Sequence, residues 1–233
     1  MRTHEPTDTA RGAGQRANES GGRDEWAPDV QQLVVATAGA LLIGVLFLAL
    51  PPEVTRVPSW LLLVVEALLL APPFVAALFL ERALPYPIAR GLAFGLLAVL
   101  TAALIGSVSL LIGQLGGKIT GRELIRPAGL LWASNVLVFA IWYWETDGGG
   151  PRHRFAAGHQ AADFKFPQQD GGNPTGWAPG FVDYLFLAFC TATALSPADT
   201  YPLTRGAKLL MMAEAVISGL VLVLLIARSI NII

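Results

Sequence analysis

The sequence contains few charged residues, few histidines and a single cysteine. Only 14% of its 233 residues are charged, whereas 54% are hydrophobic. A soluble domain of this length needs more charge to cover its surface, so the composition predicts a membrane protein whose main partner is the lipid bilayer. The net charge of −1 gives no electrostatic basis for binding nucleic acid, and we expect no such partner.

The scarcity of reactive side chains also limits the chemistry that the chain can perform. Cys190 is the only cysteine, which excludes an internal disulfide and a thiolate metal cluster. The spacing of His153, His159 and Asp163 matches no known metal site. The sequence has no phosphate-binding loop, nucleophile elbow or zinc-protease motif. We therefore expect no cofactor, no metal and no enzymatic activity.

Long apolar stretches alternate with polar segments along the chain. Residues 1–32 are too polar to bury a core and are predicted to be a disordered tail. Residues 33–145 contain stretches long enough to cross about 30 Å of hydrocarbon. Residues 146–180 are rich in glycine and proline and too polar for the bilayer, so they are predicted to form an aqueous loop. The stretches expected to cross are about Leu33–Leu50, Trp60–Leu80, Ile88–Ile112 and Ala128–Trp144, followed after the loop by about Ala207–Ile230.

One apolar stretch is too short to be an ordinary span. The sequence "FVDYLFLAFCTATAL" extends from Phe181 to Leu195. With only about fifteen residues, it has the length of a helix that enters the membrane without crossing it. We therefore predict an all-α, polytopic membrane helix bundle with a re-entrant, pore-loop-like module over residues 181–233. The alternative is a pair of ordinary crossing helices joined by a tight connection.

The order of segments in this region resembles the pore module of potassium-channel-like proteins: an outer helix, a pore helix, a filter and an inner helix. Asp183 occupies the place where many such pores carry an acid before the pore helix. Thr191, Thr193 and Asp199 match the two threonines and the final acid of the pattern T-x-T-x-V-G-Y-G-D. The resemblance covers about fifty residues. It implies a homo-oligomer, a tetramer in the case of a channel.

The same segment departs from the pattern at the residues that select potassium. In place of Gly-Tyr-Gly, the sequence has Ser196, Pro197 and Ala198. A potassium filter presents successive backbone carbonyls to the ion, in a conformation that residues with a Cβ adopt only at a cost. Proline fixes φ near −65° and forbids one of the required angles. We therefore expect no selectivity of the potassium type. Ser-Pro-Ala-Asp is instead typical of a helix start capped by Ser196.

A wider set of segments resembles an uncharacterised family of bacterial integral membrane proteins. These segments are "NVLVFAIWYWETDGGGP", "DFKFP" and "PGFVDYLFLAFCTATALSPADTYPLTRGAKLLMM", within residues 128–233. The resemblance implies a multi-pass protein of the bacterial inner membrane, and it implies no particular activity.

Polar residues inside the apolar stretches are candidates for function. Glu66 lies in the second stretch and Glu214 in the last, and ionisable groups in hydrocarbon usually face a bundle interior or water. Glu214 could instead reach the membrane interface or pair with Arg205 or Lys208. Asn135 and its neighbour Ser134 can bond across helices, and a role in helix packing is the favoured interpretation for both.

These observations leave two functions open. The first is an ion-channel-like protein that passes cations, monovalent ones among them, without potassium-type selectivity. In this hypothesis Thr191, Thr193, Ser196 and Asp199 line the narrow part of the pore. The second is a non-conducting membrane scaffold or sensor that keeps a pore-like fold. The oligomeric state together with ion flux distinguishes them.

Overall fold

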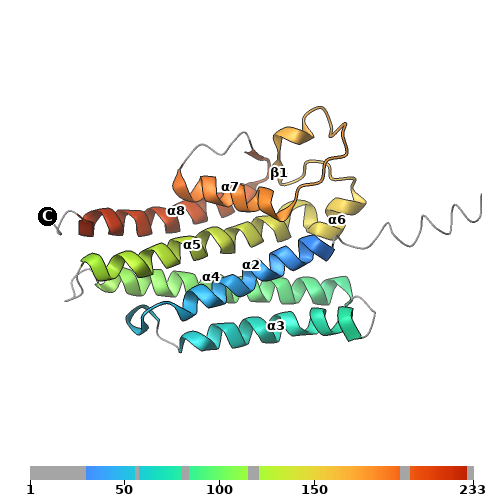
Figure 1. Ribbon diagram of the computed structural model, residues 1–233. Helices are drawn as coiled ribbons and strands as arrows, with labels where there is room; N and C mark the ends of the chain where they lie inside the picture. Colours follow the sequence, from blue (N-terminus) through green and yellow to red (C-terminus); the bar gives the residue numbers. More distant parts are fainter. Residues whose placement is uncertain (1–29, 56–57, 80–83, 115–120, 195–199, 230–233) are drawn as a thin grey trace, which may run out of the picture.

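The protein is mainly α-helical in the part described by a computed structural model, which comprises residues 30–55, 58–79, 84–114, 121–194 and 200–229. In Figure 1 the long helices run side by side, with a shorter helix, α7, alongside them. The long helices are α2 (Val30–Leu48), α3 (Ser59–Phe79), α4 (Tyr86–Gly113), α5 (Gly121–Thr146) and α8 (Arg205–Ser229), and α7 is Phe181–Thr193. The predicted all-α class is confirmed.

The ends of the first helices follow from their prolines. Helix α2 ends at Leu48, and Pro51 and Pro52 follow, with Pro52 opening the short 3-10 helix η1 (Pro52–Val54). Pro85 precedes the first residue of α4. Proline lacks a backbone N–H and fixes φ. It therefore suits the first turn of a helix and prevents a preceding helix from continuing. Pro72 and Pro73 are tolerated inside α3.

Three of the described helices are long and apolar enough to cross a membrane, and the chain therefore has the helices of a membrane protein. They cover Tyr86–Gly113, Glu123–Gly149 and Arg205–Ile226. The apolar helical segments Thr37–Leu48, Ser59–Pro73 and Phe181–Thr193 are shorter. Crossings by α2 and α3 therefore stay predictions.

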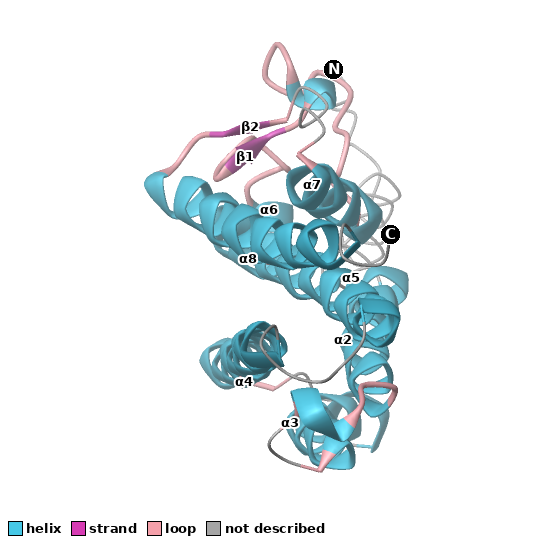
Figure 2. Ribbon diagram, turned by 90° about the vertical axis from the view of Figure 1, so that its left-hand side faces the viewer, coloured by secondary structure: helices cyan, strands magenta, loops and turns pink. Residues whose placement is uncertain are grey.

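Helix α5 is the centre of the bundle. It packs against α2, α4, α7 and α8, while α3 packs between α2 and α4. The end-on view of Figure 2 places α5, α7 and α8 together, with α3 and α4 on the other side of α2 and α5. The fully buried Leu131 and Phe139 show that α5 presents apolar side chains to several neighbours. This helix thus connects the two halves of the bundle.

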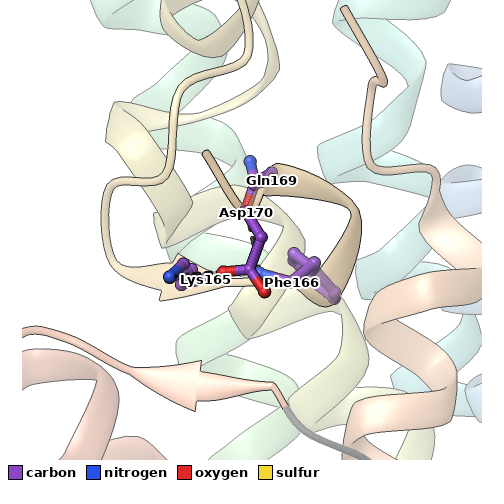
Figure 3. Close-up of polar contacts among 4 residues, drawn as sticks. All are labelled: Lys165, Phe166, Gln169 and Asp170. Atoms are coloured by element: carbon purple, nitrogen blue, oxygen red, sulfur yellow. Dashed lines mark hydrogen bonds and ion pairs between the residues drawn. The ribbon is translucent and has the colours of Figure 1, made fainter. Parts of the chain in front are cut away.

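The segment after α5 folds into a small cap at one end of the bundle, next to the start of α7 (Figure 1). We use the word cap for residues 147–180. It contains the 3-10 helix η3 (Asp147–Gly149), helix α6 (Pro151–Ala156), strand β1 (Phe164–Lys165) and the 3-10 helix η4 (Pro167–Gln169). Figure 3 shows β1 followed by η4, with Lys165 paired with Asp170 at 2.6 Å. The Phe166 amide donates to Gln169 Oε1 at 2.9 Å in the same view.

The chain returns to the cap after α7. Strand β2 (Tyr201–Pro202) pairs antiparallel with β1, with Lys165 opposite Tyr201. The other end of α7 lies beside the middle of α8, where the Ser218 hydroxyl donates to the Ala192 carbonyl at 2.5 Å. Ser218 is about 20 Å from the start of α8, at 1.5 Å of rise per residue. Helix α7 thus extends from the cap to roughly half the depth of α8.

Candidate functional site

The two threonines of the filter-like segment lie on different faces of α7. Thr191 follows the buried Tyr184 and Leu187 at helical spacing and faces α5 and α8. Thr193 follows the exposed Phe186 and Phe189 at the same spacing. Each hydroxyl donates to a carbonyl of its own helix, Thr191 to Leu187 at 2.9 Å and Thr193 to Phe189 at 2.8 Å. The two side chains therefore do not form one lining.

The other two filter-like residues, Ser196 and Asp199, lie outside the described residues. Asp183, the acid expected before a pore helix, caps α7 locally. Its Oδ2 accepts the Gly180 amide at 2.7 Å, so this carboxylate satisfies one of the free N–H groups at the helix start.

A buried polar cluster lies where α5, α7 and α8 meet. Glu214 of α8 has no exposed surface, and its Oε2 accepts a hydrogen bond from the Tyr143 hydroxyl of α5. The Thr191 hydroxyl also lies close to Tyr143. The other Glu214 oxygen, Oε1, is buried without a hydrogen-bond partner. We call Tyr143, Glu214, Thr191 and Asn135 the polar cluster.

Asn135 completes the polar cluster from the side of α5. Its Nδ2 donates to the backbone carbonyl of Glu214 at 3.3 Å. Its Oδ1 is buried and has no partner, which leaves a second free acceptor near Glu214. The neighbouring Ser134 bonds the Leu130 carbonyl of its own helix at 2.9 Å. Asn135 therefore bonds across helices, while Ser134 does not.

Three of the residues singled out in the sequence thus come together, since Thr191, Asn135 and Glu214 share this cluster. The sequence does not single out Tyr143, which lies in the aromatic run "WYWE" of residues 142–145. The signal that could have identified it is spacing. Asn135 and Tyr143 are eight residues apart on one helix, which places them roughly on one face.

Glu66 is a separate site on the other side of the bundle. Its side chain lies between α3 and α2 with no exposed surface. Neither carboxyl oxygen has a hydrogen-bond partner, and the carboxyl rests on the backbone of Gly44. A Cβ at position 44 would overlap the Glu66 carboxyl, so a larger residue there would require this carboxyl to move.

The cap next to α7 contains a second set of buried polar side chains, and these are well partnered. Asp147 Oδ1 accepts the amides of Asp163 and Phe164 at 2.9 and 3.1 Å. Its Oδ2 accepts the Tyr184 hydroxyl at 2.5 Å, which ties the cap to α7. Arg154 donates to the carbonyls of Trp144 and Asp147 at 2.6 and 2.7 Å.

Further along the cap, His159 and Asp163 have structural contacts. Asp163 accepts the Gly148 amide at 2.9 Å and the Thr204 hydroxyl at 2.6 Å. The His159 carbonyl accepts from Gln169 and Asn173 at 2.9 and 3.2 Å. Burial, and then the nearby Arg154 charge, lower the pKa of the His159 imidazole below its ordinary value. Within the described residues, no three His, Cys, Asp or Glu side chains form a group that could hold a metal ion.

The polar cluster has a carboxyl oxygen free to bind a positive charge, whereas Asp147 and Arg154 have hydrogen-bond partners in the cap, in α5 and in α7. Elsewhere in the cap, the Nδ1 atom of His159 is buried without a partner. A carboxyl with one donor and one free oxygen, in a water-poor interior, is neutralised by a proton or by a cation. The Tyr143 hydroxyl oxygen at this carboxyl and the nearby Thr191 hydroxyl oxygen are further acceptors of the kind that bind hard cations. Asn135 contacts Glu214 at its backbone carbonyl.

Comparison with known proteins gives no relative for this chain. No protein-family model matches it, and neither the curated proteins nor the solved structures contain a significant match.

Proposed function

We propose that the chain is a multi-pass protein of the bacterial inner membrane that conducts monovalent cations without potassium-type selectivity. Helix α7 would enter the bilayer from the side of the cap, and the chain after α7 would return to that side without crossing the bilayer. The observation that carries the proposal is the polar cluster, which places a buried carboxyl beside the inner end of this half-length helix. No enzymatic role is proposed.

The path of the chain around α7 supports a re-entrant arrangement. The start of α7 is joined to the cap through Tyr184 and Asp147. The strand that follows α7 pairs with β1, which belongs to the same cap. The segment that begins with α7 therefore starts and ends at the cap, on one side of the bundle. Ala192, near the end of α7, lies about 20 Å along α8, which is short of the roughly 30 Å of hydrocarbon.

The cost of burying Glu214 supports a role in cation handling. An ionisable side chain inside a membrane helix is expensive and usually marks an ion or proton pathway. In this chain the carboxyl keeps one free oxygen, and the free Oδ1 of Asn135 belongs to the same cluster. Ser196 and Asp199, which follow α7 in the sequence, would add a hydroxyl and a carboxylate to the pathway.

The oligomeric part of the proposal rests on the outer face of α7. Val182, Phe186 and Phe189 are exposed on this face at helical spacing, and Thr193 follows them. In a homo-oligomer this face would turn toward a neighbouring copy, and Thr193 would then lie near the shared axis. A single copy would expose the same side chains to lipid.

A non-conducting scaffold or sensor is the second candidate, and the orientation of Thr191 favours it. The hydroxyl is turned into its own protomer, where it donates to the Leu187 carbonyl and lies close to Tyr143. A residue that lines an oligomeric pore should instead face the axis. In this alternative the polar cluster fixes α7 against α5 and α8 and binds no transported ion.

Cation flux into liposomes tests the proposal. Liposomes that contain the purified protein should take up several monovalent cations. The variants Glu214→Gln and Asp199→Ala should each reduce this flux. Glu53→Gln is the matched control, since Glu53 is an exposed acid in η1 and should leave the flux unchanged. A monomer with no flux above that of empty liposomes would contradict conduction and leave the scaffold function.

A further inference from the structure

Glu66 is a buried carboxyl that the proposed cation pathway does not use. It lies on α3 against α2, whereas the polar cluster lies among α5, α7 and α8. Its side chain has no exposed surface, and both oxygens lack a hydrogen-bond partner. By comparison, Glu214 has a tyrosine donor. Glu66 is thus the more isolated of the two buried acids.

Among the described residues packed around Glu66, there is no charge that could stabilise a carboxylate. Helix α3 packs against α2 and α4. The described side chains of α2 include no titratable group, and Glu66 is the only one described on α3. On α4 the titratable side chains are Tyr86 and Arg90, near its start. The part of α4 beside Leu62 and Val65 includes Ala103, about 20 Å further along the helix.

We propose that Glu66 is a proton-binding site, in which the carboxyl holds an exchangeable proton against the backbone of Gly44. An ionised carboxylate without a partner in a medium of low polarity costs several kcal/mol, and binding a proton removes that cost. A sodium ion would need several more oxygen ligands than this apolar site provides. The inference goes beyond the proposed cation pathway and does not rest on it.

A cavity lies beside the turn of α3 that precedes Glu66. It has a volume of about 580 Å³ and is bounded by α2, α3 and α4 and by Thr55 and Pro58. Leu62 and Val65, one turn and one residue before Glu66, line it. Most of the lining is apolar, and its polar residues are Thr55, Ser59, Ser107 and Ser109. A small lipophilic reagent can therefore come within one helical turn of the carboxyl.

Covalent labelling with a lipophilic carbodiimide tests the proposal. The protonated carboxyl adds across one C=N bond, its oxygen bonding the central carbon and its proton passing to nitrogen. The acyl group then migrates from oxygen to nitrogen and gives a stable N-acylurea. Nothing leaves and no oxidant is required. Mass spectrometry of the full-length protein should locate the added mass on Glu66 near neutral pH, but not on the exposed Glu53.

Controls separate the site from unspecific labelling. Glu66→Gln should lose all label at this position while the label on other acids is unchanged. Gly44→Ala should reduce labelling because the new methyl group displaces the carboxyl, and Gly95→Ala, which has open space around it, should not. Infrared spectroscopy of the unlabelled protein should show a protonated carboxyl band that Glu66→Gln removes.

Three outcomes would overturn the assignment. The first is folded protein in which the reagent modifies other acids but never Glu66. The second is an infrared spectrum in which Glu66→Gln removes no protonated carboxyl band. The third is protection from labelling by sodium chloride, but not by choline chloride, at constant pH. That last result would identify a metal cation as the ligand. Because Glu214→Gln is not used, failure here leaves the flux experiment unaffected.

Discussion

The cap and the helix bundle both bury polar side chains, but the number of hydrogen-bond partners of these side chains differs. In the cap, Asp147 has three donors and Arg154 has two carbonyl acceptors. In the bundle, Glu214 has a single side-chain donor and Glu66 has none. Burial alone does not distinguish the sites, because each of these four side chains is at most 3% exposed.

The number of hydrogen-bond partners, and not the depth of burial, therefore indicates what a buried ionisable side chain does. A fully partnered group stabilises one conformation, and removing a partner destabilises the fold. A buried acid without partners contributes little to stability and is retained for another reason, such as binding a proton or an ion.

The largest expected effect is at Asp147. Asp147→Ala leaves two amides and the Tyr184 hydroxyl without their acceptor and should lower the free energy of unfolding by about 3–5 kcal/mol. Asp170→Ala is the control, because the Lys165–Asp170 pair is largely exposed and is worth at most about 1 kcal/mol. Thermal unfolding of purified protein in detergent measures both. Equal losses would mean that the cap network is not a stability element.

A smaller effect is expected at Gly44. Gly44→Ala introduces a methyl group where the Glu66 carboxyl lies, and overpacking of this kind costs about 1–3 kcal/mol. Gly95→Ala on α4 meets no atom within 4 Å and should be neutral or slightly stabilising. The double variant Gly44→Ala with Glu66→Ala should recover part of the loss in the same thermal unfolding assay. No recovery would show that the carboxyl is not what the methyl group meets.

Removing the Tyr143 hydroxyl leaves the Glu214 carboxyl without a side-chain donor, as in Glu66. Tyr143→Phe should lower the free energy of unfolding by about 1–2 kcal/mol, the usual cost of a lost hydrogen bond to a buried acceptor. Tyr201→Phe changes an exposed tyrosine and should leave stability within about 0.5 kcal/mol of the parent. Chemical unfolding in detergent checks both variants. A loss above that of Asp147→Ala would reverse the contrast between cap and bundle.

The smallest effect is a pH dependence in the cap. The pKa of His159 is lowered from its ordinary value of 6.5, so the folded state binds this proton more weakly than the unfolded state. Stability from this group is therefore fully present above pH 6.5 and declines as the pH falls below it. The decline should be smaller in His159→Asn, which suits the positive φ of 55° at this position. Thermal unfolding at about pH 7.5 and about pH 5.5 measures it, and an identical decline in both proteins would contradict the assignment.

Much of the helical architecture follows from the apolar runs. The stretch predicted at Phe181–Leu195 is α7 (Phe181–Thr193), and the last predicted span, Ala207–Ile230, is α8 (Arg205–Ser229). Apolar length is a local property, so a single sequence contains it. Helix α5, which corresponds to the fourth predicted span, begins at Gly121 and not at the predicted Ala128. Arg122, Glu123 and Arg126 interrupt the hydrophobic pattern but not the helix.

The candidate site was less accessible to sequence reasoning. Glu66 and Glu214 stand out because acids are rare in apolar stretches. Their partners do not, since Tyr143 lies 71 residues from Glu214 and the pairing depends on how α5 and α8 face each other. The cap was similarly hidden. Its bonds join positions such as Asp147 and Tyr184 across turns that have no periodic pattern to read.

The packing of α7 has a consequence for how the protein is made. Its thirteen residues are too few to be recognised as a span, and its buried side contacts both α5 and α8. When α7 leaves the ribosome, α5 is present but α8 has not been synthesised. We therefore expect α7 to settle only after α8 has inserted. A chain truncated before Arg205 should retain the first helices in the membrane and expose α7 to proteolysis.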